Sequence, residues 1–163
     1  MLFRSVSCLD RIQVPLQRLT GRFPGLRLLV IGADWSAPGV EVECRGWDLE
    51  REPADLTDCD IGIMPVPDDP WTRGKGGYKL LQYMATALPV VTDPVGINTE
   101  IVVDGENGFL VDGDHGWESA LARLIEDADL RVRLGRSEEH TSELQSRRNL
   151  VFRPLLAKKN HLH

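Results

Sequence analysis

Residues 74–91 read GKGGYKLLQYMATALPVV, which places a glycine-rich loop, a helix and a strand in direct succession. Residues 77–87 carry apolar side chains at helical spacing, which predicts a helix with one buried side. The apolar residues on that side are Leu80, Leu81, Met84 and Ala85. Residues 89–92 then form a short apolar run, typical of a strand that is buried on both faces. Elements in this order are the building unit of an α/β fold.

The same alternation extends in both directions from this stretch. Short apolar runs predict further strands at residues 26–31, 61–64 and 108–111, and alternating apolar and charged residues predict one with a wetter face at 40–44. Helical spacing predicts helices at residues 9–19 (interrupted by Pro15), 117–126 and 130–134, with a short helix or a loop at 50–58. The alternation predicts a Rossmann-like parallel sheet with helices on both faces. Such a sheet binds ligands beyond the carboxyl ends of its strands, here just after Ile31, Met64 and Thr92.

Glycines and cations gather in the loop that precedes the predicted 77–87 helix. The glycines are Gly74, Gly76 and Gly77, and the cations are Arg73, Lys75 and Lys79. Glycine lets the backbone approach a ligand closely, and the first amide groups of a helix carry partial positive charge. Together these features suit a diphosphate. On spacing alone, a plain glycine-rich connection with solvated lysines stays open, because the loop has neither a Walker A pattern nor the position of a dinucleotide fingerprint.

Three stretches carry a resemblance to a known family. They read DIGIMPVPDDPW at residues 60–71, GKGGYKLLQYMATALPVV at 74–91 and GINTEIVVDGENGFLV at 96–111. In this order they resemble the C-terminal, donor-binding domain of family 4 glycosyltransferases, and more narrowly a bacterial branch, over residues 9–135. The resemblance implies two Rossmann-like domains with the active site between them, and transfer of a sugar from a nucleotide donor with retention at the anomeric carbon.

The resemblance also implies roles for individual residues. Lys75 and Lys79 would stabilise the leaving diphosphate, and no metal ligand or cofactor is expected besides the nucleotide-diphosphate sugar that serves as donor substrate. The donor-binding residues would be Gly74, Gly76, Gly77, Tyr78, Gln82, Gly96 and Asn98. Most family members carry two glutamates where this chain has Gly74 and Gln82. Gln82 can still bond ribose hydroxyls, whereas Gly74 offers no side chain.

Several other residues have two interpretations each. Asp68 or Asp69 would contact the sugar in place of the missing glutamate, or would belong to a turn with the neighbouring prolines. Gly96 and Asn98 would contact the donor, or would form a plain turn in which Asn98 or Thr99 caps a helix. Gly32 is expected at the wall of the cleft. Trp47 and Trp71 would stack on the nucleotide base or line the cleft, or pack in the core or a loop. His115 is expected to be a capping or surface residue.

Composition limits the classes of function. The 163 residues carry a net charge of −6, which argues against general nucleic-acid binding. The three cysteines show no metal-site spacing and no disulfide framework, and favour a cytoplasmic setting. Expected partners are a nucleotide sugar, an unknown acceptor and a missing N-terminal acceptor domain, with peripheral membrane association of the full-length enzyme.

Composition changes after Gly135, and residues 136–163 are expected to have little or no native structure. Residues 136–146 read RSEEHTSELQS and residues 149–159 read NLVFRPLLAKK, which resemble the in-frame translation of a sequencing adapter. Setting that segment aside leaves residues 1–135 as a truncated nucleotide-sugar-binding domain.

Two rival functions remain. One is a catalytically inactive nucleotide-binding fragment that lacks the acceptor domain. The other is an unrelated doubly wound domain such as a signalling receiver, which would need an acidic pocket that Asp34, Asp60 and Asp68 do not form convincingly.

Overall fold

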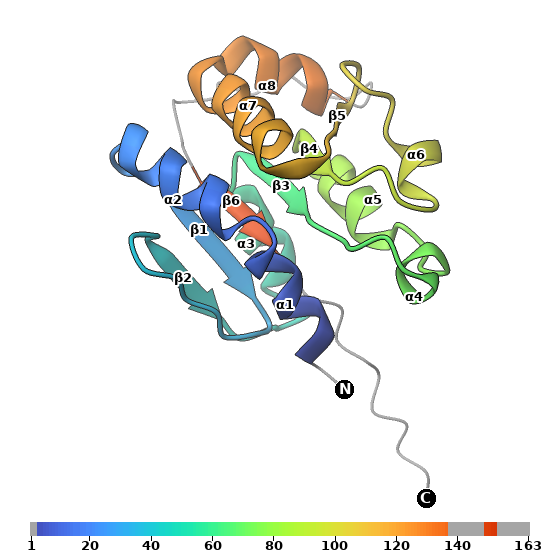
Figure 1. The fold of residues 1–163 in the computed structure, drawn as a ribbon, viewed down its shortest axis with the longest axis horizontal. Helices are drawn as coiled ribbons and strands as arrows, with labels where there is room; N and C mark the ends of the chain where they lie inside the picture. The colour runs from blue at the N-terminus through green and yellow to red at the C-terminus, as the bar shows by residue number, and fades with distance from the viewer. Residues whose placement is uncertain (1–2, 137–148, 153–163) are drawn as a thin grey trace, which may run out of the picture.

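The computed structural model describes residues 3–136 and 149–152. Within these residues, six parallel strands form one sheet in the order β2-β1-β6-β3-β4-β5. The strands are β1 (Arg27–Ile31), β2 (Val42–Arg45), β3 (Ile61–Met64), β4 (Val90–Thr92), β5 (Gly108–Leu110) and β6 (Asn149–Phe152). Helices cover both faces of this sheet (Figure 1). The predicted α/β class with a Rossmann-like parallel sheet is confirmed.

One face of the sheet is covered by the first two helices of the chain and by the two helices that follow β5. The helices on this face are α1 (Phe3–Asp10), α2 (Gln13–Arg22), α7 (Gly113–Glu126) and α8 (Ala128–Gly135). Side chains of β1 alternate between the faces, with Leu28 and Val30 toward these helices and Leu29 and Ile31 toward the opposite core. The sequence suggested that Pro15 interrupts a helix, but it does not interrupt α2. It lies in the first turn of α2, where a proline costs no helical hydrogen bond.

The other face is covered by α3 (Glu52–Thr57), α5 (Tyr78–Ala85) and α6 (Asn98–Ile101). The orientation of α5 differs from the prediction: Leu80 and Tyr83 are buried, whereas Leu81 is 53% exposed and Ala85 is exposed. The reason lies in β3, where a Cβ on Gly62 would lie only 2.5 Å from the Tyr83 ring. The bare backbone of Gly62 therefore admits Tyr83 and turns Leu81 outward.

Strand β6 lies within residues 136–163, the segment expected to have little or no native structure. Its backbone lies between β1 and β3, pairing with β1 along Asn149–Phe152 and with β3 at Leu150 and Val151 (Figure 1). Apolar, β-branched and aromatic residues favour strands, and the facing edges of β1 and β3 offer backbone groups that need partners. Residues 137–148 and 153–163 lie outside the described residues, and the adapter resemblance of this segment stays a prediction.

The carboxyl ends of the parallel strands lie at one edge of the sheet. The helix α4 (Pro70–Arg73) follows the end of β3, and α1 lies at the same edge (Figure 1). Across the described ranges, no helix is long and apolar enough to cross a membrane. Because parallel sheets bind ligands beyond the carboxyl ends of their strands, the loops at this edge are where a ligand site is expected.

Candidate functional site

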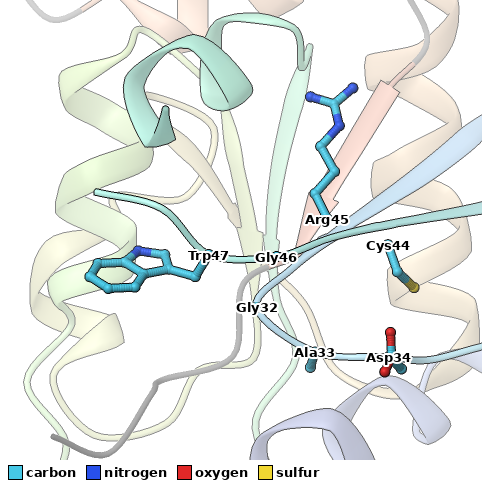
Figure 2. Close-up of a pocket in the computed structure, with 7 residues that line it drawn as sticks. All are labelled: Gly32, Ala33, Asp34, Cys44, Arg45, Gly46 and Trp47. Carbon is cyan, nitrogen blue, oxygen red and sulfur yellow. The ribbon is translucent and has the colours of Figure 1, made fainter. Parts of the chain in front are cut away.

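A cavity of about 340 Å³ lies beyond the carboxyl ends of β1 and β2. Its lining comes from residues 32–34, which follow β1, and residues 44–47 at the end of β2 (Figure 2). Gly32 adopts a φ of +84°, which turns the chain at the end of β1. Gly32 thus lies in the wall of this cavity, as expected. The cavity is of the size that small-molecule sites have.

Arg45 is a wall residue whose charge is already paired. Its Nη1 lies 2.7 Å from Asp55 Oδ1, and its Nε lies 2.7 Å from Glu43 Oε1. Figure 2 shows the Arg45 side chain pointing away from Trp47. Arg45 therefore stabilises the loop and is not an anion ligand.

Trp47 connects the cavity to α5 through a buried carboxylate. The indole Nε1 of Trp47 donates to Glu52 Oε2 over 3.2 Å, and Gln82 Nε2 donates to Glu52 Oε1 over 3.2 Å. Glu52 is only 5% exposed, whereas Trp47 is 41% exposed. The three residues, named here the Trp47–Glu52–Gln82 chain, come from the loop after β2, the first turn of α3, and α5.

The predicted cations of the loop before α5 differ in their surroundings. Lys79 is 6% exposed, and burial lowers its pKa to about 7, with further lowering from the neighbouring Lys75 ammonium. Lys75 is half-buried, and its Nζ lies 5.8 Å from the centre of the Trp71 ring. Neither lysine lines the cavity beyond β1 and β2. Lys79 is thus a buried group whose charge depends on what lies beside it.

Arg11, at the junction of α1 and α2, belongs to the same region and was not anticipated. Burial raises the pKa of the Cys8 thiol, and the charges of Lys75, Lys79 and Arg11 oppose that rise, so these three cations lie within electrostatic range of Cys8. Arg11 Nη2 also lies 3.7 Å from Asp93 Oδ1. No sequence signal links Arg11 to the 73–79 loop, because only the fold of α1 over the carboxyl edge brings them together.

A second cavity, of about 280 Å³, lies beyond β4 and is lined by residues including Arg11, Asp93 and Trp117. Asp93 is 2% exposed, and burial raises the pKa of its carboxyl group. Opposing that rise, Asp93 accepts hydrogen bonds from the Val66 amide (2.8 Å) and from Trp117 Nε1 (3.3 Å). Asp93 therefore ties three segments of the carboxyl edge together.

The structure gives the predicted glycines different tasks. A Cβ on Gly77 would lie 2.3 Å from Ile101 Cδ1, and one on Gly96 would lie 2.9 Å from the Arg73 carbonyl oxygen. These two glycines permit close packing between loops and helices. Gly76 has open space around it, and Gly74 ends α4, where a Cβ would meet nothing closer than 3.7 Å. Gly76 is therefore the glycine beside which a ligand has room.

Two other predicted donor-binding residues differ in their exposure: Asn98 is buried and Tyr78 is exposed. Asn98 is 3% exposed, and its Nδ2 donates to Thr92 Oγ1 (2.9 Å) and to the Asp93 carbonyl (3.3 Å), so this amide group holds α6 to the end of β4. It does not cap α6, whose N-cap is Ile97. Tyr78 is 61% exposed at the start of α5, with its side chain available at the surface.

The two aspartates before α4 belong to a turn. Asp69 is the N-cap of α4 and forms a capping box with Thr72, whose amide nitrogen lies 2.8 Å from Asp69 Oδ1. Asp68 is paired with Arg73 through bonds of 2.6 and 2.9 Å. The turn interpretation is confirmed.

The remaining predictions concern aromatic residues and a histidine. Core packing is wrong for both Trp47 and Trp71, which are 41% and 59% exposed. His115 is exposed in the first turn of α7, as expected for a surface residue.

Comparison with known proteins decides the family. Residues 12–127 match the family described as glycosyl transferases group 1. The chain belongs to the group 1 glycosyl transferases. It is similar to the D-inositol 3-phosphate glycosyltransferase of Corynebacterium glutamicum (strain R), with 34% identity over 103 residues, which cover 60% of this chain and 23% of that protein. The enzyme of the same description from Corynebacterium efficiens is 39% identical over 61 residues, covering 36% of this chain and 14% of the relative. The chain thus spans about a quarter or less of the length of these relatives.

A solved structure supports the fold of this group 1 domain. The C-terminal domain of a glycosyl transferase group 1 family protein (LpcC) from Francisella tularensis superimposes with a TM-score of 0.51 and 19% identity. The match covers 78% of this chain and 88% of that domain. The chain therefore has the fold of a C-terminal domain of this family.

Proposed function

We propose that this domain binds the diphosphate and the nucleoside of a nucleotide-sugar donor, and that the complete enzyme transfers the sugar with retention. The observation that carries the proposal is the pair Lys75 and Lys79, one in the loop before α5 and the other in the first turn of α5, at the carboxyl edge of the sheet of an acidic protein. Arg11 lies within electrostatic range of the same region. Membership of a glycosyl transferase family supports a sugar donor as the ligand. Assignment to family 4 is part of this proposal.

The cations come from two segments, the junction of α1 and α2 and the loop before α5, that both act electrostatically on Cys8. Lys79 lies in the first turn of α5, whose amide groups add the positive end of a helix dipole. A buried ammonium beside an anion interacts more strongly than an exposed one, because solvent screens it less. Gly76 leaves open space beside these groups.

The proposed role of these cations is to stabilise the leaving group. As the bond between the anomeric carbon and the phosphate oxygen breaks, its electron pair passes to the diphosphate, whose charge grows. Lys75, Lys79 and the first amide groups of α5 would hold that charge. The acceptor hydroxyl would attack from the same side as the departing diphosphate and give it a proton, which retains the configuration of the sugar.

A second candidate is a nucleotide-binding fragment without activity. The chain spans 23% of the length of the Corynebacterium glutamicum relative. The two candidates differ in turnover and agree on the ligand.

Titration calorimetry with UDP, GDP and inorganic pyrophosphate tests the proposal, together with an assay for sugar release from UDP- and GDP-sugars. We expect one of the nucleotides to bind more tightly than pyrophosphate, and pyrophosphate to bind detectably. Binding without turnover would favour the fragment. Absence of binding by all three ligands would contradict the proposed function.

A further inference from the structure

The Trp47–Glu52–Gln82 chain carries an inference that rests on the proposed function and extends it. We propose that Glu52 is a positioning residue that fixes Trp47 in the wall of the cavity beyond β1 and β2 and orients Gln82 on the neighbouring α5, and that the two residues select a ligand containing a nucleoside over a bare diphosphate. Glu52 has this role although it is outside the three stretches that carry the family resemblance.

The chemistry of a carboxylate explains the arrangement. An ionised carboxylate only accepts hydrogen bonds, so the groups that face it must be donors. Trp47 Nε1 and Gln82 Nε2 each lie 3.2 Å from a different oxygen of Glu52. One buried side chain therefore fixes both the indole plane of Trp47 and the direction in which the Gln82 amide carries its nitrogen.

The position of Gln82 joins the two parts of the site. Lys79 and Gln82 are three residues apart on α5, a spacing that places them on neighbouring positions of one helix face. Lys79 belongs to the group of cations, and Gln82 is linked through Glu52 to Trp47 in the wall of the cavity. A ligand with a diphosphate at Lys79 would thus extend along α5 toward Trp47.

The exposed part of Trp47 suits an aromatic base. Trp47 is 41% exposed although its indole nitrogen is hydrogen-bonded, so its polar edge is held while ring surface stays accessible. A nucleobase stacks on such a surface, and pyrophosphate does not use it. The cavity volume of about 340 Å³ falls within the range of small-molecule sites.

Glu52→Ala and Glu52→Gln in the full chain test the inference, with the exposed neighbour Glu50→Ala as a matched control. Calorimetry would measure the Kd of UDP, GDP and pyrophosphate for each variant, and thermal unfolding would report the fold. We expect Glu52→Ala to weaken the preferred nucleotide about tenfold and to leave pyrophosphate within about twofold. Glu52→Gln, which keeps one acceptor oxygen, should lie in between, and Glu50→Ala should change neither ligand.

A double variant separates positioning from general support of the fold. If Glu52 acts through Gln82, the effects of Glu52→Ala and Gln82→Ala should not add. The double variant should then bind the nucleotide within about twofold of whichever single variant binds it more weakly. An unchanged ratio of nucleotide to pyrophosphate affinity in both Glu52 variants would overturn the inference while leaving the proposed function in place. If the wild-type chain binds neither ligand, the proposed function itself fails, and this inference fails with it.

Discussion

The loop before α5 and the Trp47–Glu52–Gln82 chain lie at the same edge of the sheet, but they are encoded differently. In the loop, Lys75 and Lys79 stand close together in the sequence with glycines around them. In the Trp47–Glu52–Gln82 chain, three residues from three elements meet only through the fold, and Glu52 and Gln82 are 30 positions apart in the sequence. A contiguous group of charges can be found by reading the sequence, whereas a polar chain that crosses elements cannot.

We expect the largest loss of ligand affinity from Lys79→Met, which changes the loop region and leaves the cavity region intact. Loss of the buried ammonium should weaken pyrophosphate and nucleotide alike, by about 10- to 100-fold, which is the scale of a hydrogen bond to a charged group. Removal of a buried charge should leave the melting temperature unchanged or higher. Calorimetry and thermal unfolding measure the two quantities, and pyrophosphate binding within twofold of wild type would show that the loop is not the phosphate site.

The pH dependence of binding tests whether the Lys79 ammonium group holds the diphosphate. Burial lowers the pKa of Lys79 to about 7, and a bound diphosphate favours the ammonium form. Affinity for pyrophosphate should therefore fall as the pH rises above 7, by at most about tenfold per pH unit for one linked proton. Calorimetry in buffers of different ionisation enthalpy would detect proton uptake on binding. A pH profile identical to that of Lys79→Met would contradict this role.

The same pKa shift predicts the direction of a stability change. Between pH 7 and the ordinary lysine pKa of 10.5, the folded chain holds fewer protons on Lys79 than the unfolded chain. The free energy of unfolding of the wild type should therefore rise with pH across this window, relative to Lys79→Met. Chemical denaturation at several pH values measures it, and a relative fall would contradict the burial of Lys79.

A smaller and more selective effect is expected at the cavity. Trp47→Ala should weaken the preferred nucleotide about tenfold through lost stacking and leave pyrophosphate unaffected. Trp71→Ala is the matched control, because Trp71 is also exposed but lies beside Lys75 and not in the cavity wall. Equal effects of both substitutions on the nucleotide would remove the distinction between the two regions.

The smallest effect is expected at Arg73, which the sequence placed among the phosphate cations. The structure pairs it with Asp68 at the surface, and such exposed ion pairs contribute little. Arg73→Ala should leave the affinities for nucleotide and pyrophosphate and the melting temperature close to those of the wild type. A loss of affinity comparable to that caused by Lys79→Met would show that Arg73 binds the ligand.

Sequence reading predicts the sheet well, because short apolar runs mark buried strands such as β3 and β4. It fails where packing decides the outcome. Gly62 admits Tyr83 and so sets the rotation of α5, which buries Lys79 and exposes Leu81. Arg11 and Glu52 join the site through tertiary contacts that no local spacing signals.

A crystal structure of the chain with its preferred nucleoside diphosphate would locate both parts of the ligand. We expect a diphosphate within hydrogen-bonding distance of Lys79 Nζ at the start of α5, and a base against the ring of Trp47. A nucleotide bound elsewhere, or a diphosphate away from Lys75 and Lys79, would contradict this expectation.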